Sequence, residues 1–291
     1  MNLSETTKEA AKWVTRCLPD RVYLSIAYRA KLGKKLNLDT PATFNEKIQW
    51  IKLNKHETFL NTLVDKYLVK DIVAKLIGEE YIIPTIGAWE SFDEIDFSKL
   101  PNQFVLKCNH DSHSVVICQD KKSLDYAAAK KRLNSSLKRN YFWHGREWAY
   151  KDVKPLIIAE PYIADQNNEL VDYKFFCFKD FVDCVMVCSD RKSGNPKFYF
   201  VDKEWNVLKY NKRAIEDPDG FAVDKPKNLD KMFKLAKELS VFSKMPFVRI
   251  DLYNVDGRIY FGEFTFSPDN GMDSNILKET DEYFGKLMHL Q

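Results

Sequence analysis

The 291-residue sequence predicts an α+β fold in which a helical region precedes antiparallel sheets. Helix-type spacing of apolar residues fills the first part of the chain, up to Gly78. Beyond it, short apolar stretches follow one another closely, which indicates hairpins instead of repeated βαβ units. Near the C-terminus, residues 248–268 alternate apolar and polar side chains at period two, as the arms of a β-hairpin do.

Composition and charge exclude several classes of protein. Hydrophobic residues make up 45% and aromatic residues 14% of the chain, which favours a packed core over disorder. The 45 lysines and arginines nearly balance the 42 acidic residues, so the net charge of +3 does not point to nucleic acid. The longest apolar runs are of strand length, and the first twenty residues lack the apolar core of a signal peptide. We expect a cytoplasmic protein.

Six cysteines support this expectation. Five fall in predicted strands, where a free thiol behaves as a small hydrophobic group, and none forms a Cys-x-x-Cys pair. The histidine pair His110 and His113 has no evident third ligand nearby. We therefore expect free thiols and no structural zinc.

Helix signals dominate the N-terminal region. Thr43 followed by Glu46 is a capping box, and Asp65 is placed to cap a second helix that Gly78 ends. Basic and aromatic residues alternate through residues 1–36. This pattern would suit an anionic membrane surface, a capsule-assembly partner or a polyanionic substrate; the alternative is a solvated face whose apolar side packs on the rest of the protein.

Beyond the N-terminal region the sequence predicts two more helices and several strands. Ser123 is placed to cap a helix that runs to about Arg139, and residues 229–240 form another amphipathic helix. Strands are predicted near residues 104–107, 115–118, 156–163, 173–179, 182–189 and 197–201.

The register of the C-terminal hairpin decides which side chains meet. With Asp256-Gly257 as a two-residue turn, Asp251 and Glu263 would face opposite sides of the sheet. With Val255-Asp256-Gly257 as a three-residue loop, charged and apolar residues separate cleanly onto two faces. We predict the second register. One face then carries Arg249, Asp251, Glu263 and Thr265, and the other carries Val248, Ile250, Leu252, Phe264 and Phe266.

Two carboxylates beside an arginine suit a hard cation. Mg²⁺ is usually held by one or two carboxylates and completed by substrate phosphates and water. Asp251 and Glu263 are therefore candidate Mg²⁺ ligands. The alternative is a solvated sheet face or an ion pair with Arg249.

Two further segments carry candidate binding residues. Lys107 ends a strand before the polar loop Asn109–Ser114, an arrangement suited to a phosphate. An apolar strand runs into Glu160-Pro161-Tyr162-Ile163, where the proline indicates the edge or end of a strand. A surface lysine and an ordinary hairpin strand are the alternatives.

The order of these segments resembles the ATP-grasp superfamily, and most closely its branch of TupA-like proteins of teichuronopeptide biosynthesis. The resemblance covers roughly residues 40–280 and includes TFNEKIQWIKLN, DYKFFCF and GEFTFSPDNGM. It implies two lobes with antiparallel sheets and flanking helices, at residues 79–160 and 161–291, behind a helical N-terminal region at residues 1–78.

The resemblance also implies residue roles. Lys107 would contact ATP phosphates, with Ser112 and His113 in the phosphate loop, and Glu160, Pro161, Tyr162 and Ile163 would form the adenine hinge. Asp165 or Glu169 would contact the ribose. Lys174 would be a second cation on phosphates or substrate, Arg249 would stabilise charge on the transferred group, and Asp251, Glu263 and Thr265 would form the metal site.

Two departures from the family pattern stand out. The phosphate loop in this superfamily is usually glycine-rich, whereas residues 109–114 contain no glycine, and Thr265 stands where the family commonly has asparagine. His110 or His113 could deprotonate an incoming amine, since imidazole titrates near neutrality. Arg191, in the polar loop 190–196, could reach a carboxylate substrate; a surface turn is the alternative.

The activity implied is an ATP- and Mg²⁺-dependent carboxylate–amine ligase. Its partners would be a small-molecule amine and a carboxylated sugar or polysaccharide precursor. The alternatives are a glycosyltransferase that uses a nucleotide sugar, and a degenerate nucleotide-binding protein, which the glycine-free loop suggests.

Overall fold

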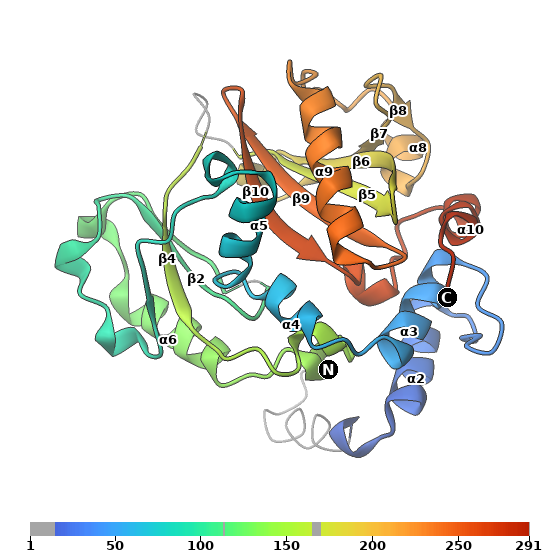
Figure 1. Cartoon of the computed structure of the whole chain (residues 1–291), viewed down its shortest axis with the longest axis horizontal. Helices are drawn as coiled ribbons and strands as arrows, with labels where there is room; N and C mark the ends of the chain where they lie inside the picture. The colour runs from blue at the N-terminus through green and yellow to red at the C-terminus, as the bar shows by residue number, and fades with distance from the viewer. Residues whose placement is uncertain (1–14, 113, 165–169, 291) are drawn as a thin grey trace.

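Two antiparallel sheets organise the chain in this computed structural model, which describes residues 15–112, 114–164 and 170–290. The first has the strand order β1-β4-β2-β3, and the second has the order β10-β9-β5-β6-β7-β8 (Figure 1). The first sheet comprises β1 (Gly87–Trp89), β2 (Phe104–Cys108), β3 (Val116–Cys118) and β4 (Ile157–Pro161). The second comprises β5 (Asp172–Phe178), β6 (Phe181–Ser189), β7 (Lys197–Val201), β8 (Val207–Leu208), β9 (Val248–Val255) and β10 (Arg258–Thr265). The predicted α+β class is confirmed.

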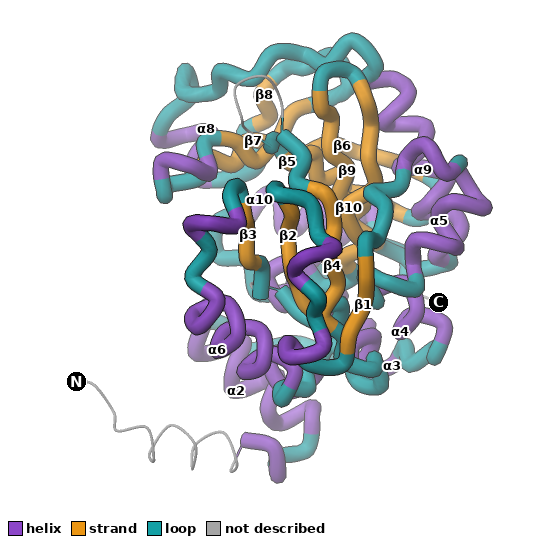
Figure 2. Tube along the Cα trace, turned by 90° about the vertical axis from the view of Figure 1, so that its left-hand side faces the viewer, coloured by secondary structure: helices purple, strands orange, loops and turns teal. Residues whose placement is uncertain are grey.

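Helices pack around the two sheets. In the described N-terminal part they are α2 (Asp20–Leu32), α3 (Phe44–Asn54), α4 (Phe59–Val64) and α5 (Val69–Ile77). The later helices are α6 (Tyr126–Leu137), α7 (Phe142–Gly145), α8 (Lys212–Glu216), α9 (Leu229–Ser243) and α10 (Lys278–Leu287). The long helix α9 covers one face of the six-stranded sheet, and α6 packs beside the first sheet (Figures 1 and 2). The division into residues 1–78, 79–160 and 161–291 stays a prediction.

Helix starts follow local side-chain chemistry. The capping box of α3 is present, since Thr43 accepts a hydrogen bond from the Glu46 amide and the Glu46 carboxylate accepts one from the Thr43 amide. Asp65 accepts bonds from the amides of Tyr67 and Leu68, and α5 begins directly after them. The helix predicted from Ser123 begins later, at Tyr126. Asp125 caps it instead, because its carboxylate accepts the Ala128 amide at 2.9 Å.

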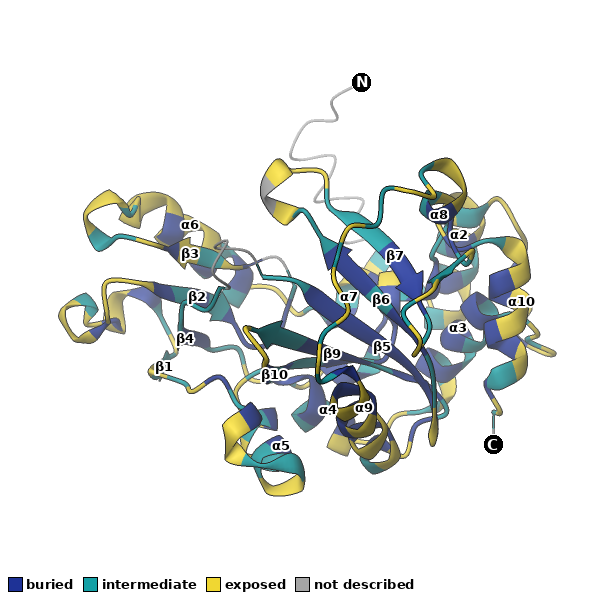
Figure 3. Cartoon of the chain, turned by 90° about the horizontal axis from the view of Figure 1, so that it is seen from above, coloured by how far each residue is buried: buried dark blue, intermediate teal, exposed yellow. Residues whose placement is uncertain are grey.

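Aromatic side chains fill the larger core, to which the second sheet contributes residues. The strands of this sheet are largely buried, as the dark blue ribbon shows (Figure 3). Phe44 of α3 packs edge-on against Phe247, with ring centroids 4.8 Å apart, and against Phe284 of α10 at 5.6 Å. A separate core joins the first sheet to α6 through Phe104, Leu106 and Leu133. All six cysteines are free, as expected. Within the described residues, no helix is both long and apolar enough to span a membrane.

The C-terminal hairpin reaches the predicted faces by a different route. The predicted three-residue loop is wrong: Val255 pairs with Arg258, and Asp256 and Gly257 form a two-residue turn with φ of 51° and 87°. A bulge between Phe261 and Glu263 then shifts the register, so Asp251 pairs directly with Glu263. A Cβ at Gly262 would lie 2.9 Å from the Asp251 carbonyl oxygen, which explains the glycine at this bulge.

Candidate active site

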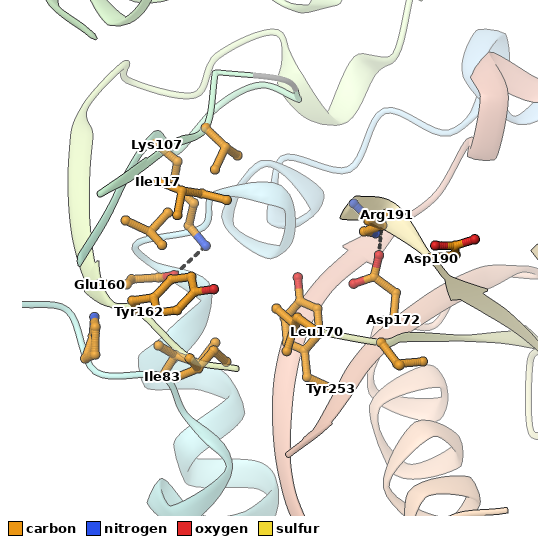
Figure 4. Close-up of a pocket in the computed structure, with 15 residues that line it drawn as sticks. Ile83, Lys107, Ile117, Glu160, Tyr162, Leu170, Asp172, Asp190, Arg191 and Tyr253 are labelled. Carbon is orange, nitrogen blue, oxygen red and sulfur yellow. Dashed lines mark ion pairs between the residues drawn. The ribbon is translucent and has the colours of Figure 1, made fainter. Parts of the chain in front are cut away.

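A cavity of about 280 Å³ lies between the two sheets (Figure 4). One wall comes from the first sheet and the segments beside it, and the other comes from β9 and the segment before β5. Apolar and aromatic side chains form most of its lining: Ile83, Val105, Ile117, Tyr162, Leu170 and Tyr253. A slot with two such walls suits the flat face of an aromatic base.

The predicted hinge lies in this wall. Glu160 and Pro161 end β4, and Pro161, Tyr162 and Ile163 line the cavity. The Tyr162 hydroxyl accepts a hydrogen bond from the Gln119 amide at 2.9 Å. Asp165 and Glu169, predicted at the ribose, lie outside the described residues.

Glu160 joins two lysines at the inner end of the cavity. Its carboxylate lies 2.6 Å from the Lys107 ammonium and 2.7 Å from that of Lys70, a residue of α5 that sequence reasoning missed. Burial alone would raise the pKa of Glu160, but the two ammonium groups hold it below its usual value. The triad carries a net charge of +1 beside the cavity, which favours an anion such as a phosphate.

The charged face of the β9–β10 hairpin forms the second part of the site. Arg249 donates two hydrogen bonds to Asp251, at 2.7 and 2.8 Å, and a third to the Thr265 hydroxyl at 3.1 Å. The Lys174 ammonium lies 2.5 Å from Asp251. Glu263 lies 3.8 Å from Arg249, so the structure brings together five predicted residues: Lys174, Arg249, Asp251, Glu263 and Thr265.

Glu263 is partly buried, with 29% of its side chain exposed, and its pKa is lowered. Burial would raise its pKa, but Lys66, Lys174 and Arg249 hold the pKa at about 2. Lys66 lies 3.3 Å from Glu263 and also donates to the Asp111 carbonyl oxygen at 2.8 Å, so it links the hairpin to the phosphate loop. Sequence reasoning missed Lys66, because a lysine in a helix-rich segment carries no signal of its own.

These residues fit Mg²⁺ bound together with a phosphate ligand. Two carboxyl groups, those of Asp251 and Glu263, belong to residues directly paired across β9 and β10, with the Thr265 hydroxyl beside them. No group of three or more acidic, histidine or cysteine side chains that could hold a metal occurs among the described residues. A two-carboxylate site of this kind suits Mg²⁺, which keeps waters and phosphate oxygens as its other ligands.

A family model for TupA-like ATP-grasp proteins matches residues 46–289. The chain belongs to the TupA-like ATP-grasp family. Its two antiparallel sheets and the cavity between them are the ATP-grasp fold predicted from the sequence. No curated protein matches the chain significantly.

Solved structures similar to this TupA-like chain include ligases of small substrates. An L-amino acid ligase from Bacillus licheniformis is 15% identical with a TM-score of 0.48, and the match covers 91% of this chain and 56% of that one. The VanG D-Ala:D-Ser ligase from Enterococcus faecalis is 14% identical with a TM-score of 0.46, over 78% and 60% of the two chains. A D-alanine–D-alanine ligase from Helicobacter pylori is 17% identical with a TM-score of 0.38, over 78% and 61%. The chain thus spans roughly three fifths of the length of such structures.

The glycine-free loop of this TupA-like chain is shaped by its own polar side chains. Asn109 accepts the Leu156 amide at 2.7 Å and donates to the Lys154 carbonyl oxygen at 3.0 Å. Asp111 accepts bonds from the hydroxyls of Ser114 and Ser136, while Ser114 also accepts the Cys108 amide. These bonds fix a turn that glycines would leave flexible.

The predicted catalytic role of His110 is not supported. The side chain is buried, and its Nε2 lies 3.2 and 3.1 Å from the carbonyl oxygens of Ser136 and Arg139. Burial lowers the pKa of His110, and the ring anchors the loop to the end of α6. Ser112 also lies apart from the 280 Å³ cavity: it lines a surface hollow beside Ser135 and Arg139. His113 lies outside the described residues.

Arg191 lies at the rim of the cavity and forms an ion pair with Asp172 (Figure 4). Asp172 lies 3.6 Å from Lys174, so this pair connects the polar segment after β6 to the charged face of the hairpin. The guanidinium is half exposed and can still meet an anion at the rim. Its predicted contact with a carboxylate substrate stays a prediction.

A second, more polar cavity of about 430 Å³ adjoins the charged face. Lys174 and Arg249 line it, so they lie both at the Asp251–Glu263 pair and at this cavity. Its outer wall comes from α8 and the turn after β10, through Lys212, Arg213, Asp269 and Asp273. We call it the acceptor cleft below. Sequence reasoning did not find it, because its walls lie far apart in the chain.

Proposed function

We propose that this chain is an ATP- and Mg²⁺-dependent ligase that joins an amine to a carboxylate through an acyl phosphate. The observation that carries the proposal is the position of Lys174 and Arg249. They lie at the Asp251–Glu263 pair and also line the acceptor cleft, so a phosphoryl donor and a carboxylate can meet at them. Membership of the TupA-like ATP-grasp family and the apolar slot for a base support the same conclusion.

The chemistry follows from the poor leaving group of a carboxylate. An acceptor carboxylate oxygen attacks the terminal phosphorus of ATP, the bond to ADP breaks, and an acyl phosphate forms. The amine then attacks the acyl carbon, inorganic phosphate leaves, and the ammonium proton passes to solvent. Positioning and charge neutralisation supply most of such catalysis.

The chain's own residues have separate tasks in this scheme. Lys107, held by Glu160, would bind phosphate oxygens, and the Pro161–Ile163 segment would bind the base. Arg249 and Lys174 would orient the carboxylate and stabilise negative charge on the transferred group. Asp251 and Glu263 would hold Mg²⁺, which neutralises phosphate charge when bound.

We further propose a uronate or side-chain carboxylate of a bacterial surface polysaccharide as the acceptor, and an amino acid or other small amine as the donor. The family supports this substrate class, and the polar acceptor cleft is compatible with a sugar carboxylate. The reaction would take place in the cytoplasm, with or without attachment to the membrane surface.

Nucleotide specificity gives the first test. Thermal stability is measured with Mg²⁺ and ATP, ADP, GTP or UDP-sugars; a ligand at about 100 times its Kd adds roughly 2.7 kcal/mol to the native state. We expect stabilisation by adenine nucleotides. Stabilisation by UDP-sugars alone would instead support a glycosyltransferase.

ATP turnover gives the second test. ADP release is measured with mixtures of amines and uronates for wild type, Asp251→Asn, Glu263→Gln and the exposed control Asp180→Asn. We expect amine-dependent release in wild type and the control, and a loss of at least a hundredfold in the two site variants, with folding checked by circular dichroism. Full activity in both site variants would overturn the metal assignment, and nucleotide binding without turnover in any mixture would indicate a degenerate enzyme.

A further inference from the structure

Another cavity of about 430 Å³ adjoins the acceptor cleft. It lies between α2, α7 and the turn after β10, and its lining includes Tyr23, Ala27, Lys31, His144, Asn270 and Ser274. Asp269 and Asn275 line this cavity and the acceptor cleft alike. The two cavities therefore share part of one wall, with Arg249 lining the acceptor cleft and residues of α2 lining the other cavity.

Hydrogen bonds hold the shared wall from both sides. Asp269 and Asn270 both have positive φ, 48° and 56°, and the Asn270 carbonyl oxygen accepts bonds from Lys52 at 2.5 Å and Gln49 at 2.8 Å. On its other side, the Asn275 carbonyl oxygen accepts the Lys212 amide at 2.9 Å. A wall fixed in this way can bind a ligand without the entropy cost of ordering a loop.

The side chains around both spaces suit hydroxyl groups. A sugar hydroxyl both donates and accepts, and the wall offers carboxylate acceptors at Asp269 and Asp273 and an amide of both kinds at Asn275. Ser274 adds a hydroxyl, and the Tyr23 ring adds a flat face on the α2 side.

The two cavities are lined by charges of both signs: the carboxylates of Glu216, Asp269 and Asp273, and cations that an anionic ligand could contact. Lys31 of α2 lies on one cavity and Lys212 of α8 on the other, and neither ammonium forms an ion pair within the described part of the chain. Arg213 has only a distant partner, Asp217, at 3.9 Å. Negative units spaced along one ligand would meet these cations in turn.

An extended peptide fits the wall less well. Peptides commonly bind by adding a strand to a free sheet edge. Here the amides of Lys212 and Leu277 already donate to the carbonyl oxygens of Asn275 and Tyr210, both at 2.9 Å. Binding must therefore come from side chains, which favours a polyhydroxylated ligand.

We propose that the cavity at α2 is a subsite for a neighbouring unit of the acceptor, so that the enzyme acts on an extended anionic oligosaccharide and not on a single uronate. One sugar unit places its carboxylate at Arg249 and Lys174, and the next unit lies against α2. The placement of the first unit rests on the proposed function. The proposed acceptor is thereby narrowed from any sugar carboxylate to an oligosaccharide that carries several carboxylates.

Acceptor length is the variable that tests the subsite. ADP release is measured for wild type with a uronate monomer and with oligouronates of two to four units, at equal carboxylate concentration. We expect kcat/KM to rise at least tenfold from monomer to dimer. Ala27→Trp, which fills the cavity, and Lys31→Ala should each lower this length advantage severalfold. Ala30→Trp, on the exposed face of the same helix, is the matched control that should keep it.

The outcomes separate the two proposals. Equal use of monomer and dimer by wild type would overturn the subsite and leave the ligase intact, and a preference for acidic peptides over oligouronates would also overturn it. If no acceptor supports ATP turnover, the ligase proposal fails, and calorimetric binding of the oligouronate to wild type and Ala27→Trp still tests the subsite. Equal binding to both proteins would then contradict it.

Discussion

Glu147 is a buried carboxyl group close to the charged face of the hairpin. Burial raises its pKa from 4.5 to about 7, with a smaller contribution from the nearby Glu263 carboxylate. The positive charges of Lys52, Arg249 and Lys66 lower this pKa but do not cancel the effect of burial. The folded protein therefore holds this proton more tightly than the unfolded chain does. The protonated group therefore contributes on the order of 3 kcal/mol to the free energy of unfolding below pH 4.5. This contribution is lost as the pH rises through 7.

Glu147→Gln should remove this part of the pH dependence. Urea unfolding between pH 4 and 8 measures the free energy of unfolding of both proteins. We expect the variant to lose less stability than wild type between pH 5 and 7. Asp273→Asn is the matched comparison. Burial raises the pKa of Asp273 from 3.8 to about 6, so this group loses its contribution to stability at a lower pH than Glu147 does. Identical slopes for wild type and Glu147→Gln would contradict the prediction.

Lys107 should matter for nucleotide affinity more than for folding. Lys107→Ala leaves Glu160 paired with Lys70 at 2.7 Å, so the buried carboxylate keeps a partner. A hydrogen bond to a charged group contributes about 1.5–3 kcal/mol, so we expect roughly ten- to hundredfold weaker ATP binding by calorimetry. Lys130→Ala, which removes only an exposed pair with Asp93, should bind ATP as wild type does. Unchanged affinity in Lys107→Ala would exclude Lys107 from the phosphate site.

At the scale of elements, the bulge at Gly262 aligns the two carboxylates. A Cβ at this position would meet the Asp251 carbonyl oxygen at 2.9 Å, so Gly262→Ala must shift β10 against β9. We expect a loss of about 1–3 kcal/mol in urea unfolding and a marked loss of Mg²⁺-dependent activity. Gly257→Asn, in the turn of the same hairpin, has open space and a residue type that tolerates positive φ. Wild-type activity in Gly262→Ala would mean that the bulge does not set the metal site.

The hairpin also shows what the sequence can and cannot predict. Alternation at period two correctly assigned Asp251 and Glu263 to one face, because burying the opposite face is the stronger constraint. The turn itself differed from the prediction. A tight Asp256-Gly257 turn and a bulge together place the same side chains on each face as a three-residue loop would. Local pattern predicts which side chains share a face; it does not show where an extra residue is inserted.

Contacts between residues far apart in the chain could not be predicted from local sequence patterns. The capping box at Thr43 was predicted because its partners lie three residues apart. Lys66 and Glu263 are 197 residues apart in the sequence, and they come to within 3.3 Å because the segment around α4 packs against β10. His110 carried a functional signal by residue type, but its buried contacts to Ser136 and Arg139 come from the position of α6.

At the scale of the whole molecule, the 280 Å³ cavity has walls from both sheets. Lys107 and Glu160 belong to the first sheet, while Asp172 and Tyr253 belong to the second (Figure 4). A ligand that contacts both walls must restrict motion of one sheet relative to the other, because it binds only when both are in place. ATP should therefore protect two regions that are distant in sequence.

Hydrogen exchange measures this coupling directly. With Mg²⁺ and ATP, we expect slower amide exchange both in residues 104–118 and 157–163 and in residues 249–265. Lys107→Ala at the same ATP concentration should lose protection in both regions together, since the phosphate contact on the first sheet is what keeps the ligand against the second. Protection confined to the first sheet would show that the nucleotide does not reach the β9–β10 hairpin, and Asp251 and Glu263 would then have to act without it.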